Sequence, residues 1–433
     1  MLHVDPALGR VTLQAGARLE VALAALRAHG WTLQNFSSIK EQQLGGWTQA
    51  GCHGTGAALP PVEETLVALK LVTPAKGTLL LDGVDNNPEL FHLAKLGLGA
   101  LGVVAEVTLQ GVRAHALAER TQVLTQAQVA AGHAARLARH RHVRYMWLPY
   151  TDAVVVVTAD PVESAPPGTV ATQLPPEAQR TAALRALLLR CDPSAAKEAP
   201  AALEALSFAD LRDRLLALNP LSAAHVAAVN AAEAEFWRAS AGVRVGDSEA
   251  ILSFECGGEQ CVSEVAHPTG TRKAPNGADL NFVRDTLAFI RAAGIAAPAP
   301  LEQRWSARSR APMSPAYSAD PDARFSWLGI IMYLPPSSGP DAATRAAVRK
   351  AFDEYQAAWM ARCGAKVGAA EHWAKIEVPA TEAGLMAMRQ RLRQRYPVER
   401  FNAARLELDP HNILGNELVD ALLPPHRVPI GSV

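Results

Sequence analysis

Two charged residues lie two positions apart in the segment Pro300–Ser306, which reads Pro-Leu-Glu-Gln-Arg-Trp-Ser. If this segment is a strand, alternation places Glu302, Arg304 and Ser306 on one face, with the residues between them on the other. A planar guanidinium can offset negative charge on a reacting oxygen, and a carboxylate can position a hydroxyl group or accept its proton. A lone Glu-x-Arg pattern more often indicates a simple ion pair, which is the alternative.

A second chemically capable segment is Glu371–Lys375, which reads Glu-His-Trp-Ala-Lys. It offers an imidazole at His372 and an ammonium group at Lys375. A histidine beside Trp373 is equally typical of a filled hydrophobic core, and that alternative stays open on the residues alone.

A glycine-rich stretch, residues 35–56, is expected to hold the molecule on which these groups act. It lacks the apolar periodicity of a core helix or strand. A backbone with few Cβ atoms can lie against a flat ligand and direct N–H groups at its acceptors. We therefore expect a bound polar ring system, with a mobile surface loop as the alternative. The glycines are Gly45, Gly46, Gly51, Gly54 and Gly56, interspersed with Gln42, Gln43, Thr48, His53 and Thr55.

The remaining patterns predict the elements around this stretch. We expect a strand, a helix and then the glycine stretch, followed by a hairpin, with helices and strands mixed from residue 116 onward. Residues 160–200 are expected to be a loop with one exposed helix. Strands are predicted at 11–15, 65–72, 78–81, 103–109, 142–148, 153–158, 250–256, 302–308 and 325–334, and helices at 19–29, 88–96, 127–138, 223–238 and 341–360.

The segment Gly97–Gly102 matches the dinucleotide fingerprint G-x-G-x-x-G. That motif needs a strand before it and a helix after it. Here a predicted helix precedes the glycines and a predicted strand follows them, so we reject a Rossmann site.

The glycine stretch, the Glu-Gln-Arg-Trp run and the His-Trp-Ala-Lys run closely resemble segments of the aldonolactone oxidoreductases, a family with the vanillyl-alcohol oxidase type of FAD fold, and in particular its galactonolactone dehydrogenases. The resemblance implies an α+β fold. It implies a partial PCMH-type FAD-binding domain over residues 1–115, and a mixed α/β cap domain that binds substrate over residues 116–433. The C-terminal segment could return to the flavin.

The resemblance also assigns roles to residues. It implies that Glu302 and Arg304 are catalytic, and that Ser38 and Lys375 bind a sugar lactone whose secondary alcohol loses a hydride to the flavin. The residues implied to bind FAD are Gln43, Leu44, Gly45, Gly46, Gly51, His53, Gly54, Gly102, Val104 and His372.

Ser37 stands at the position that controls oxygen access in the resembling family, where oxidases tend to have glycine and dehydrogenases alanine. Because serine is larger than glycine, we expect a galactonolactone dehydrogenase that makes ascorbate and passes electrons to cytochrome c. One alternative is an aldonolactone oxidase that uses O2. Another, of a different class, is a non-catalytic mitochondrial assembly or scaffold protein.

The family fold begins with a further subdomain that receives the FAD pyrophosphate, and this sequence lacks it. We therefore expect an N-terminally incomplete sequence, without the mitochondrial presequence that the resemblance implies. The resemblance places the protein at the inner membrane or in the intermembrane space of the mitochondrion, with peripheral membrane association as an option.

The composition bears on three other classes: nucleic-acid-binding proteins, membrane-spanning proteins and metalloproteins. The 433 residues are 49% hydrophobic, and 42 basic residues balance 42 acidic ones, which gives no reason to expect a nucleic-acid partner. Apolar runs fall short of the ~20 residues of a membrane span. Five scattered cysteines predict reduced thiols, and their spacing predicts no metal site.

Overall fold

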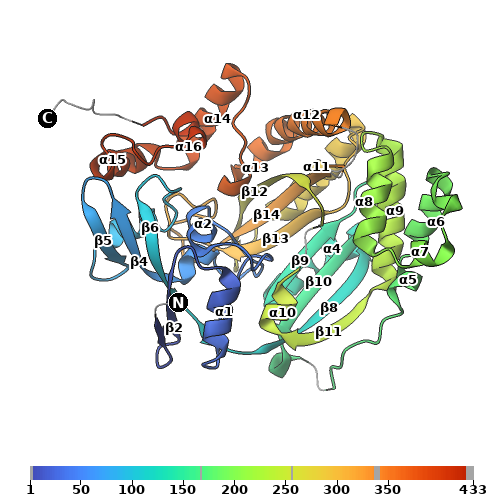
Figure 1. Cartoon of the computed structure of the whole chain (residues 1–433), viewed down its shortest axis with the longest axis horizontal. Coiled ribbons are helices and arrows are strands. Elements are labelled where there is room, and N and C mark those ends of the chain that lie inside the picture. The colour runs from blue at the N-terminus through green and yellow to red at the C-terminus, as the bar shows by residue number, and fades with distance from the viewer. Residues whose placement is uncertain (1–2, 166–167, 255–256, 336–341, 426–433) are drawn as a thin grey trace.

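The computed structural model describes residues 3–165, 168–254, 257–335 and 342–425. Two β-sheets organise the molecule, with helices packed around them, so the predicted α+β class is confirmed (Figure 1). No helix in this described part of the chain is both long and apolar enough to cross a membrane. Cys256 lies outside the described residues, and the other four cysteines are free thiols.

The smaller sheet has five antiparallel strands in the order β1-β2-β6-β4-β5. Alternation buries Val11 and Leu13 beneath it, and α1 covers them with Leu19, Leu23 and Leu26. A short pair, β3 (Trp31–Thr32) with β7 (Val112–Arg113), lies beside it. The strands are β1 (His3–Asp5), β2 (Arg10–Gln14), β4 (Leu66–Thr73), β5 (Gly77–Asp82) and β6 (Val103–Gln110), and the helices before residue 100 are α1 (Leu19–Arg27), α2 (Leu44–Gln49) and α3 (Pro88–Ala94).

The larger sheet has eight strands in the order β11-β8-β10-β9-β13-β14-β12-β15. One face of its central strands packs against α4, α11 and α12, which contribute Val129, Phe282 and Phe352 to the core. The strands are β8 (Ala116–Thr125), β9 (His142–Trp147), β10 (Ala153–Pro161), β11 (Gly242–Asp247), β12 (Gln260–Thr271), β13 (Leu301–Ala307), β14 (Ala323–Tyr333) and β15 (Ala370–Glu371).

Helices between and after these strands complete the molecule. A separate cluster of α6, α8 and α9 lies against one end of the larger sheet (Figure 1). The helices are α4 (Gln126–Arg139), α5 (Glu177–Arg180), α6 (Ala182–Cys191), α7 (Pro200–Glu204), α8 (Phe208–Leu218), α9 (Ala223–Ala239), α10 (Ser248–Leu252), α11 (Ala278–Ala293), α12 (Ala342–Trp359), α13 (Ala365–Val367), α14 (Glu382–Arg395), α15 (Val398–Leu408) and α16 (Glu417–Leu422).

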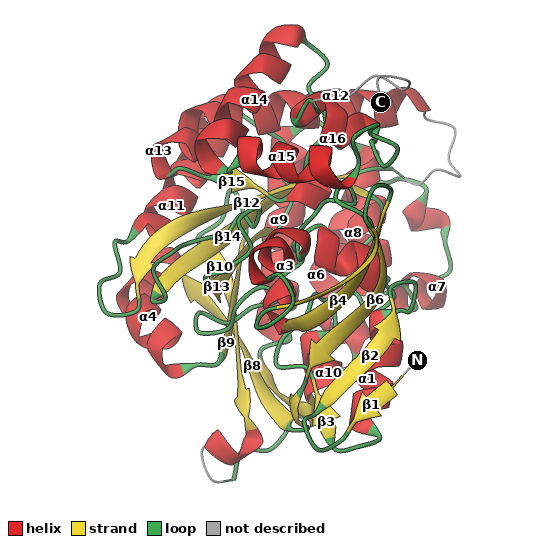
Figure 2. Cartoon of the chain, turned by 90° about the vertical axis from the view of Figure 1, so that its left-hand side faces the viewer, coloured by secondary structure: helices red, strands yellow, loops and turns green. Residues whose placement is uncertain are grey.

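The end of the chain returns to its beginning. Helices α15 and α16 lie at one end of the smaller sheet in both views, and α14 packs against α16 (Figures 1 and 2). Leu392, Phe401 and Leu422 share one hydrophobic core with the N-terminal strands. The backbone N–H of Ala75, at the β4–β5 turn, donates a hydrogen bond to the carbonyl of Leu408 at 3.0 Å. This is an ordinary N–H···O distance.

Most predicted elements are confirmed, including the hairpin of β4 and β5 and the rejection of the dinucleotide fingerprint. Helix α3 precedes Gly97 and strand β6 follows Gly102. The predicted helix over 341–360 is observed as α12, while residue 341 itself lies outside the described residues.

Three sequence predictions are wrong. The glycine stretch contains a helix, α2, because Leu44 and Trp47 bury their side chains in the core. Residues 250–254 are not a strand: helix α10 ends at Leu252, and residues 255–256 lie outside the described part. The helix α6 within residues 160–200 is not exposed, because Leu184 and Leu188 are fully buried against α8 and α9. In each case tertiary burial overrode the local pattern.

Candidate active site

A buried carboxylate, Glu264 on β12, is the centre of the site. Its Oε1 atom lies 2.8 Å from Arg304 Nη2 and 3.2 Å from His53 Nε2, and its Oε2 atom pairs with the ammonium group of Lys375. The Glu264 side chain is 2% exposed. Three segments far apart in the chain therefore meet at one carboxylate: the glycine stretch, strand β13 and the residues after β15.

Strand β13 has the predicted alternation. On one face, Arg304 Nε lies 3.4 Å from Glu302 Oε2, and Ser306 Oγ accepts a hydrogen bond from Trp327. On the other face, Gln303 accepts from Trp147, and Trp305 donates to Asp279 at 2.9 Å. The far face is therefore fixed by buried hydrogen bonds, which orient the charged face.

Sheet register explains how Arg304 reaches both carboxylates. Strand β14 runs between β12 and β13, and Gly329 on it pairs with Glu264 on one side and with Glu302 on the other. With no side chain at Gly329, nothing on β14 separates the two glutamates. The guanidinium of Arg304 can therefore contact both of them.

Two histidines beside the charged groups are neutral near pH 7. The ring of His53 stacks on Trp327 at 3.8 Å between centroids. Burial and the Arg304 guanidinium lower the pKa of His53. Burial and the Lys375 ammonium hold the pKa of His372 well below its usual range. The Nδ1 atom of His372 accepts a hydrogen bond from the N–H of Ala374, which fixes the ring.

The charges of the site do not cancel. Although burial opposes ionisation, Lys375 and Arg304 hold the pKa of Glu264 well below its usual range. Against the same opposition from burial, Arg304 and Arg144 lower the pKa of Glu302. Two carboxylates therefore face three cations, and one positive charge is left to stabilise an anion.

A metal ion is not favoured by this arrangement. Possible ligand atoms of His53, Glu264 and His372 lie within 4.8 Å of one another. Both oxygens of Glu264, however, are already paired with cations, and the repulsion from Arg304 and Lys375 disfavours a further positive ion.

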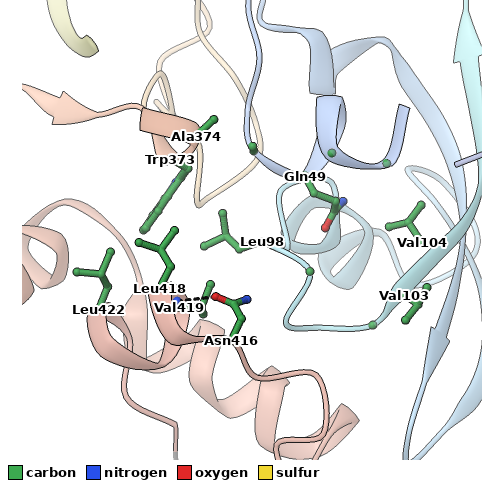
Figure 3. A pocket seen from close by; sticks show the side chains of 15 residues that line it. Gln49, Leu98, Val103, Val104, Trp373, Ala374, Asn416, Leu418, Val419 and Leu422 are labelled. Atoms are coloured by element: carbon green, nitrogen blue, oxygen red, sulfur yellow. Dashed lines mark hydrogen bonds between the residues drawn. The ribbon is translucent and has the colours of Figure 1, made fainter. Parts of the chain in front are cut away.

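A cavity of about 490 Å³ adjoins the charged cluster. Trp373 and Ala374 line it, and the adjacent residues in sequence, His372 and Lys375, belong to the cluster. Figure 3 shows the cavity between Trp373 and the C-terminal side chains on one side and Gln49 and Val104 on the other. The lining residues are Gly45, Gly46, Gln49, Ala50, Leu98, Gly99, Gly102, Val103, Val104, Trp373, Ala374, Asn416, Leu418, Val419 and Leu422.

The cavity suits a flat, largely apolar ring system. Its volume lies within the range of small-molecule and cofactor sites, and its walls are mostly apolar with a few amides. A Cβ atom at Gly46 or Gly99 would meet no other atom within 4 Å, so the space over both glycines is open. The residues present therefore fit the isoalloxazine or adenine ring of a flavin nucleotide.

The ten residues predicted to bind the cofactor divide into three sets. Four of them line the cavity: Gly45, Gly46, Gly102 and Val104. His53 and His372 instead lie in the charged cluster.

The remaining four predicted cofactor residues are placed by contacts within the chain. Gln43 precedes α2, and Leu44 is fully buried. A Cβ at Gly51 would lie 2.7 Å from Leu96, and a Cβ at Gly54 would lie 2.0 Å from Asn35 Oδ1. Packing accounts for glycine at Gly54, and packing together with a φ of +71° accounts for it at Gly51.

The two serines of the glycine stretch are partly buried. The Ser37 hydroxyl accepts a hydrogen bond from Trp47 Nε1 at 2.9 Å and donates to the side chain of Gln42. These two bonds fix the Ser37 rotamer. Ser38 is the next residue in the chain.

Sequence reasoning missed three parts of this site. Glu264 is a lone charge within the otherwise uncharged strand β12, a signal that was lost because the strand was placed at 250–256. Arg144 belongs to none of the motifs described above, yet its Nη1 atom lies 3.3 Å from Glu302 Oε1. The contribution of Asn416, Leu418 and Leu422 to the cavity wall had no sequence signal, because it depends on the return of the C-terminal helices.

Comparison with solved structures defines the fold. Cholesterol oxidase from Brevibacterium sterolicum superimposes with a TM-score of 0.68 at 16% identity, covering 96% of this chain and 81% of the other. A solvent-stable cholesterol oxidase matches equally well, at 17% identity. The fold is therefore the PCMH-type FAD-binding fold.

Comparison of sequences then defines the family. Residues 107–422 match the family model of D-arabinono-1,4-lactone oxidase, and residues 1–81 match that of an FAD binding domain. The mitochondrial L-galactono-1,4-lactone dehydrogenase of Arabidopsis thaliana is 47% identical, over 98% of this chain and 70% of its own length. That of Brassica oleracea is 46% identical, over 98% and 72%. The chain belongs to the FAD-dependent aldonolactone oxidoreductases, which confirms the predicted family and cofactor.

Proposed function

We propose that this protein oxidises L-galactono-1,4-lactone to L-ascorbate with FAD as cofactor. The observation that carries the proposal is the buried cluster of three cations and two carboxylates beside a glycine-lined cavity. The names of the relatives from Arabidopsis and Brassica support the choice of lactone. Residues 1–115 are proposed as the FAD-binding part and residues 116–433 as the substrate domain, with the C-terminal helices returning to the cofactor.

Bound FAD supplies the hydride acceptor for the carbon that carries the reacting hydroxyl. Gly45, Gly46, Gly102 and Val104 would hold its rings against the chain, because they line the cavity and add little side-chain bulk there. Gln43, Leu44, Gly51 and Gly54 are proposed to support this wall from behind.

The two carboxylates have different roles in this proposal. Glu302 is 23% exposed, so it can accept the hydrogen bond and then the proton of the substrate hydroxyl. Glu264 is buried, and it holds Arg304 and Lys375 at defined positions. Arg304 then offsets the negative charge that develops during oxidation, while Lys375 and Ser38 bind the other lactone oxygens.

His53 and His372 are proposed to face the cofactor as neutral groups. Because burial keeps both imidazoles uncharged, they add no repulsion toward Arg304 or Lys375. The excess positive charge of the cluster would stabilise negative charge on a ring system bound beside it.

Cytochrome c is the proposed electron acceptor. The mitochondrial inner membrane or intermembrane space is the proposed location, and the names of the relatives support a mitochondrial setting. The fixed Ser37 side chain supports this acceptor, because it occupies space that glycine would leave open to oxygen. An aldonolactone oxidase that uses O2 is the second candidate, supported by the family model over residues 107–422.

The test is anaerobic reduction of the FAD-loaded protein by L-galactono-1,4-lactone, followed as loss of flavin absorbance. We expect bleaching by the lactone, and then recovery on adding oxidised cytochrome c that is faster than recovery in air. Glu302→Gln should bleach slowly with an unchanged flavin content. A loaded protein that the lactone does not bleach would contradict the proposed activity and favour a scaffold role, and recovery that is faster in air would favour the oxidase.

A further inference from the structure

Arg144 contacts the proposed proton acceptor from a neighbouring strand. It lies on β9, directly opposite Arg304 of β13 in the sheet register. Its Nη1 atom donates to Glu302 Oε1 at 3.3 Å, while Arg304 Nε lies 3.4 Å from Glu302 Oε2. Each oxygen of Glu302 therefore has its own guanidinium partner.

The pairing of two arginines across strands is unfavourable by itself. Like charges that lie directly opposite in a sheet repel each other, and both side chains are largely buried, with 13% of Arg144 and 9% of Arg304 exposed. Glu302 lies between the two guanidinium groups and makes their proximity tolerable. A role in placing Glu302 explains this arrangement better than a role in stabilising the sheet.

A second contact fixes Arg144 in turn. Its guanidinium carbon lies 3.8 Å from the centroid of the Phe254 ring. Stacking on an aromatic face restrains the plane of the guanidinium and leaves its N–H edge for hydrogen bonds. Among the described residues, Glu302 accepts the hydrogen bond that Arg144 donates from this edge.

We propose that Arg144 is a positioning residue for the oxidation: it holds Glu302 as an ionised carboxylate aimed at the substrate, and Phe254 holds Arg144. The inference rests on the proposed function. Charged groups that face Glu302 come from four elements: Arg304 on β13, Arg144 on β9, Glu264 on β12 and Lys375 after β15. Lys375 is paired with Glu264. Arg144 and Arg304 are therefore the cations that contact Glu302 directly.

The main experiment compares pH profiles of kcat/KM in FAD-loaded variants. Arg144→Met removes the charge, and we expect the acid limb that reports Glu302 to move up by about one pH unit, because one of two cations is lost. We also expect kcat to fall about 10- to 100-fold as the carboxylate loses its orientation. Arg144→Lys keeps the charge without the fork, so its limb should stay near that of the wild type while kcat falls. Phe254→Leu should shift the limb in the same direction as Arg144→Met, by less.

Arg136→Met is the matched control. Arg136 is also a partly buried arginine, but it donates to Tyr145 on the helix-covered face of the same sheet. We expect it to keep the wild-type limb and kcat. An Arg144→Met limb that coincides with the wild type, or an equal shift in Arg136→Met, would overturn the inference.

A second readout needs neither flavin nor substrate. In the FAD-free protein, the loss of Tm caused by Arg144→Met should be largest near pH 7 and shrink as Glu302 is protonated at acid pH. The loss caused by Arg136→Met should not depend on pH in this way. Wild-type protein that the lactone does not bleach would refute the proposed function, whereas a pH-independent Tm loss in Arg144→Met would refute this inference.

Discussion

Replacing Glu264 by glutamine should be far more costly than its small change in shape suggests. The substitution keeps the volume but removes the charge that pairs with Arg304 at 2.8 Å and with Lys375. One such pair contributes about 4 kcal/mol at 4 Å with an effective dielectric constant of 20, offset by several kcal/mol of desolvation for the buried carboxylate. We expect the free energy of unfolding to fall by about 3–5 kcal/mol, which is typical of a broken buried pair.

The assay is urea unfolding of the FAD-free protein at pH 7, followed by tryptophan fluorescence. The sign of the pH dependence follows from the lowered pKa of Glu264. Its stabilisation is present above the ordinary glutamate pKa and is lost as pH falls through the folded value. The difference between Glu264→Gln and the wild type should therefore shrink toward acid pH.

Glu63 provides the matched control, since it is also a fully buried glutamate. Neither of its carboxylate oxygens has a hydrogen-bond partner among the described residues, and Ser309 and Ser314 lie close without a well-formed bond to it. Glu63→Gln should leave the stability at pH 5, where Glu63 is protonated in the folded protein, within about 1 kcal/mol of the wild type. A Glu264→Gln protein that loses less than about 1 kcal/mol, or no more than Glu63→Gln, would refute the reasoning.

Three further predictions concern other parts of the molecule. Burial raises the pKa of Glu63 from 4.5 to about 7, so the folded protein keeps a proton that the unfolded chain loses, and the wild type loses stability as pH rises between these two values. Glu63→Gln should therefore raise Tm at pH 8.5 but not at pH 5, and equal effects at both would contradict this. The leucine of Gly46→Leu should project into the open cavity and weaken FAD binding at least tenfold, measured by fluorescence titration, with little change in Tm. The new Cβ of Gly54→Ala meets Asn35, so this variant should lower Tm by several degrees. Identical behaviour of the two variants would count against the cavity as the cofactor site. Ser37→Gly should speed reoxidation of the reduced flavin by air, measured by stopped flow against Ser37→Ala, and no difference between these two variants would argue against steric control of oxygen.

The sequence was most informative where local pattern and burial agree. Alternation along β13 placed Glu302 and Arg304 on one face, because every second residue of that strand is fixed by hydrogen bonds on the other face. Glu264 could not be placed on that face before the order of β12, β14 and β13 was known, since its partners are 40 and 111 residues away. Helix α2 was missed for a similar reason: its two glycines disfavour a helix locally, and the burial of Leu44 and Trp47 outweighs them.

The return of helices α14 to α16 makes the first and last parts of the chain dependent on each other. Phe401 and Leu422 complete the core that begins with Val11 and Leu13, and Leu418 forms part of the cavity wall. During synthesis, the N-terminal sheet cannot finish its core until residues 382–422 have left the ribosome. A fragment that ends at residue 115 would therefore expose this core, and it would be a poor tool for studying the cofactor site in isolation.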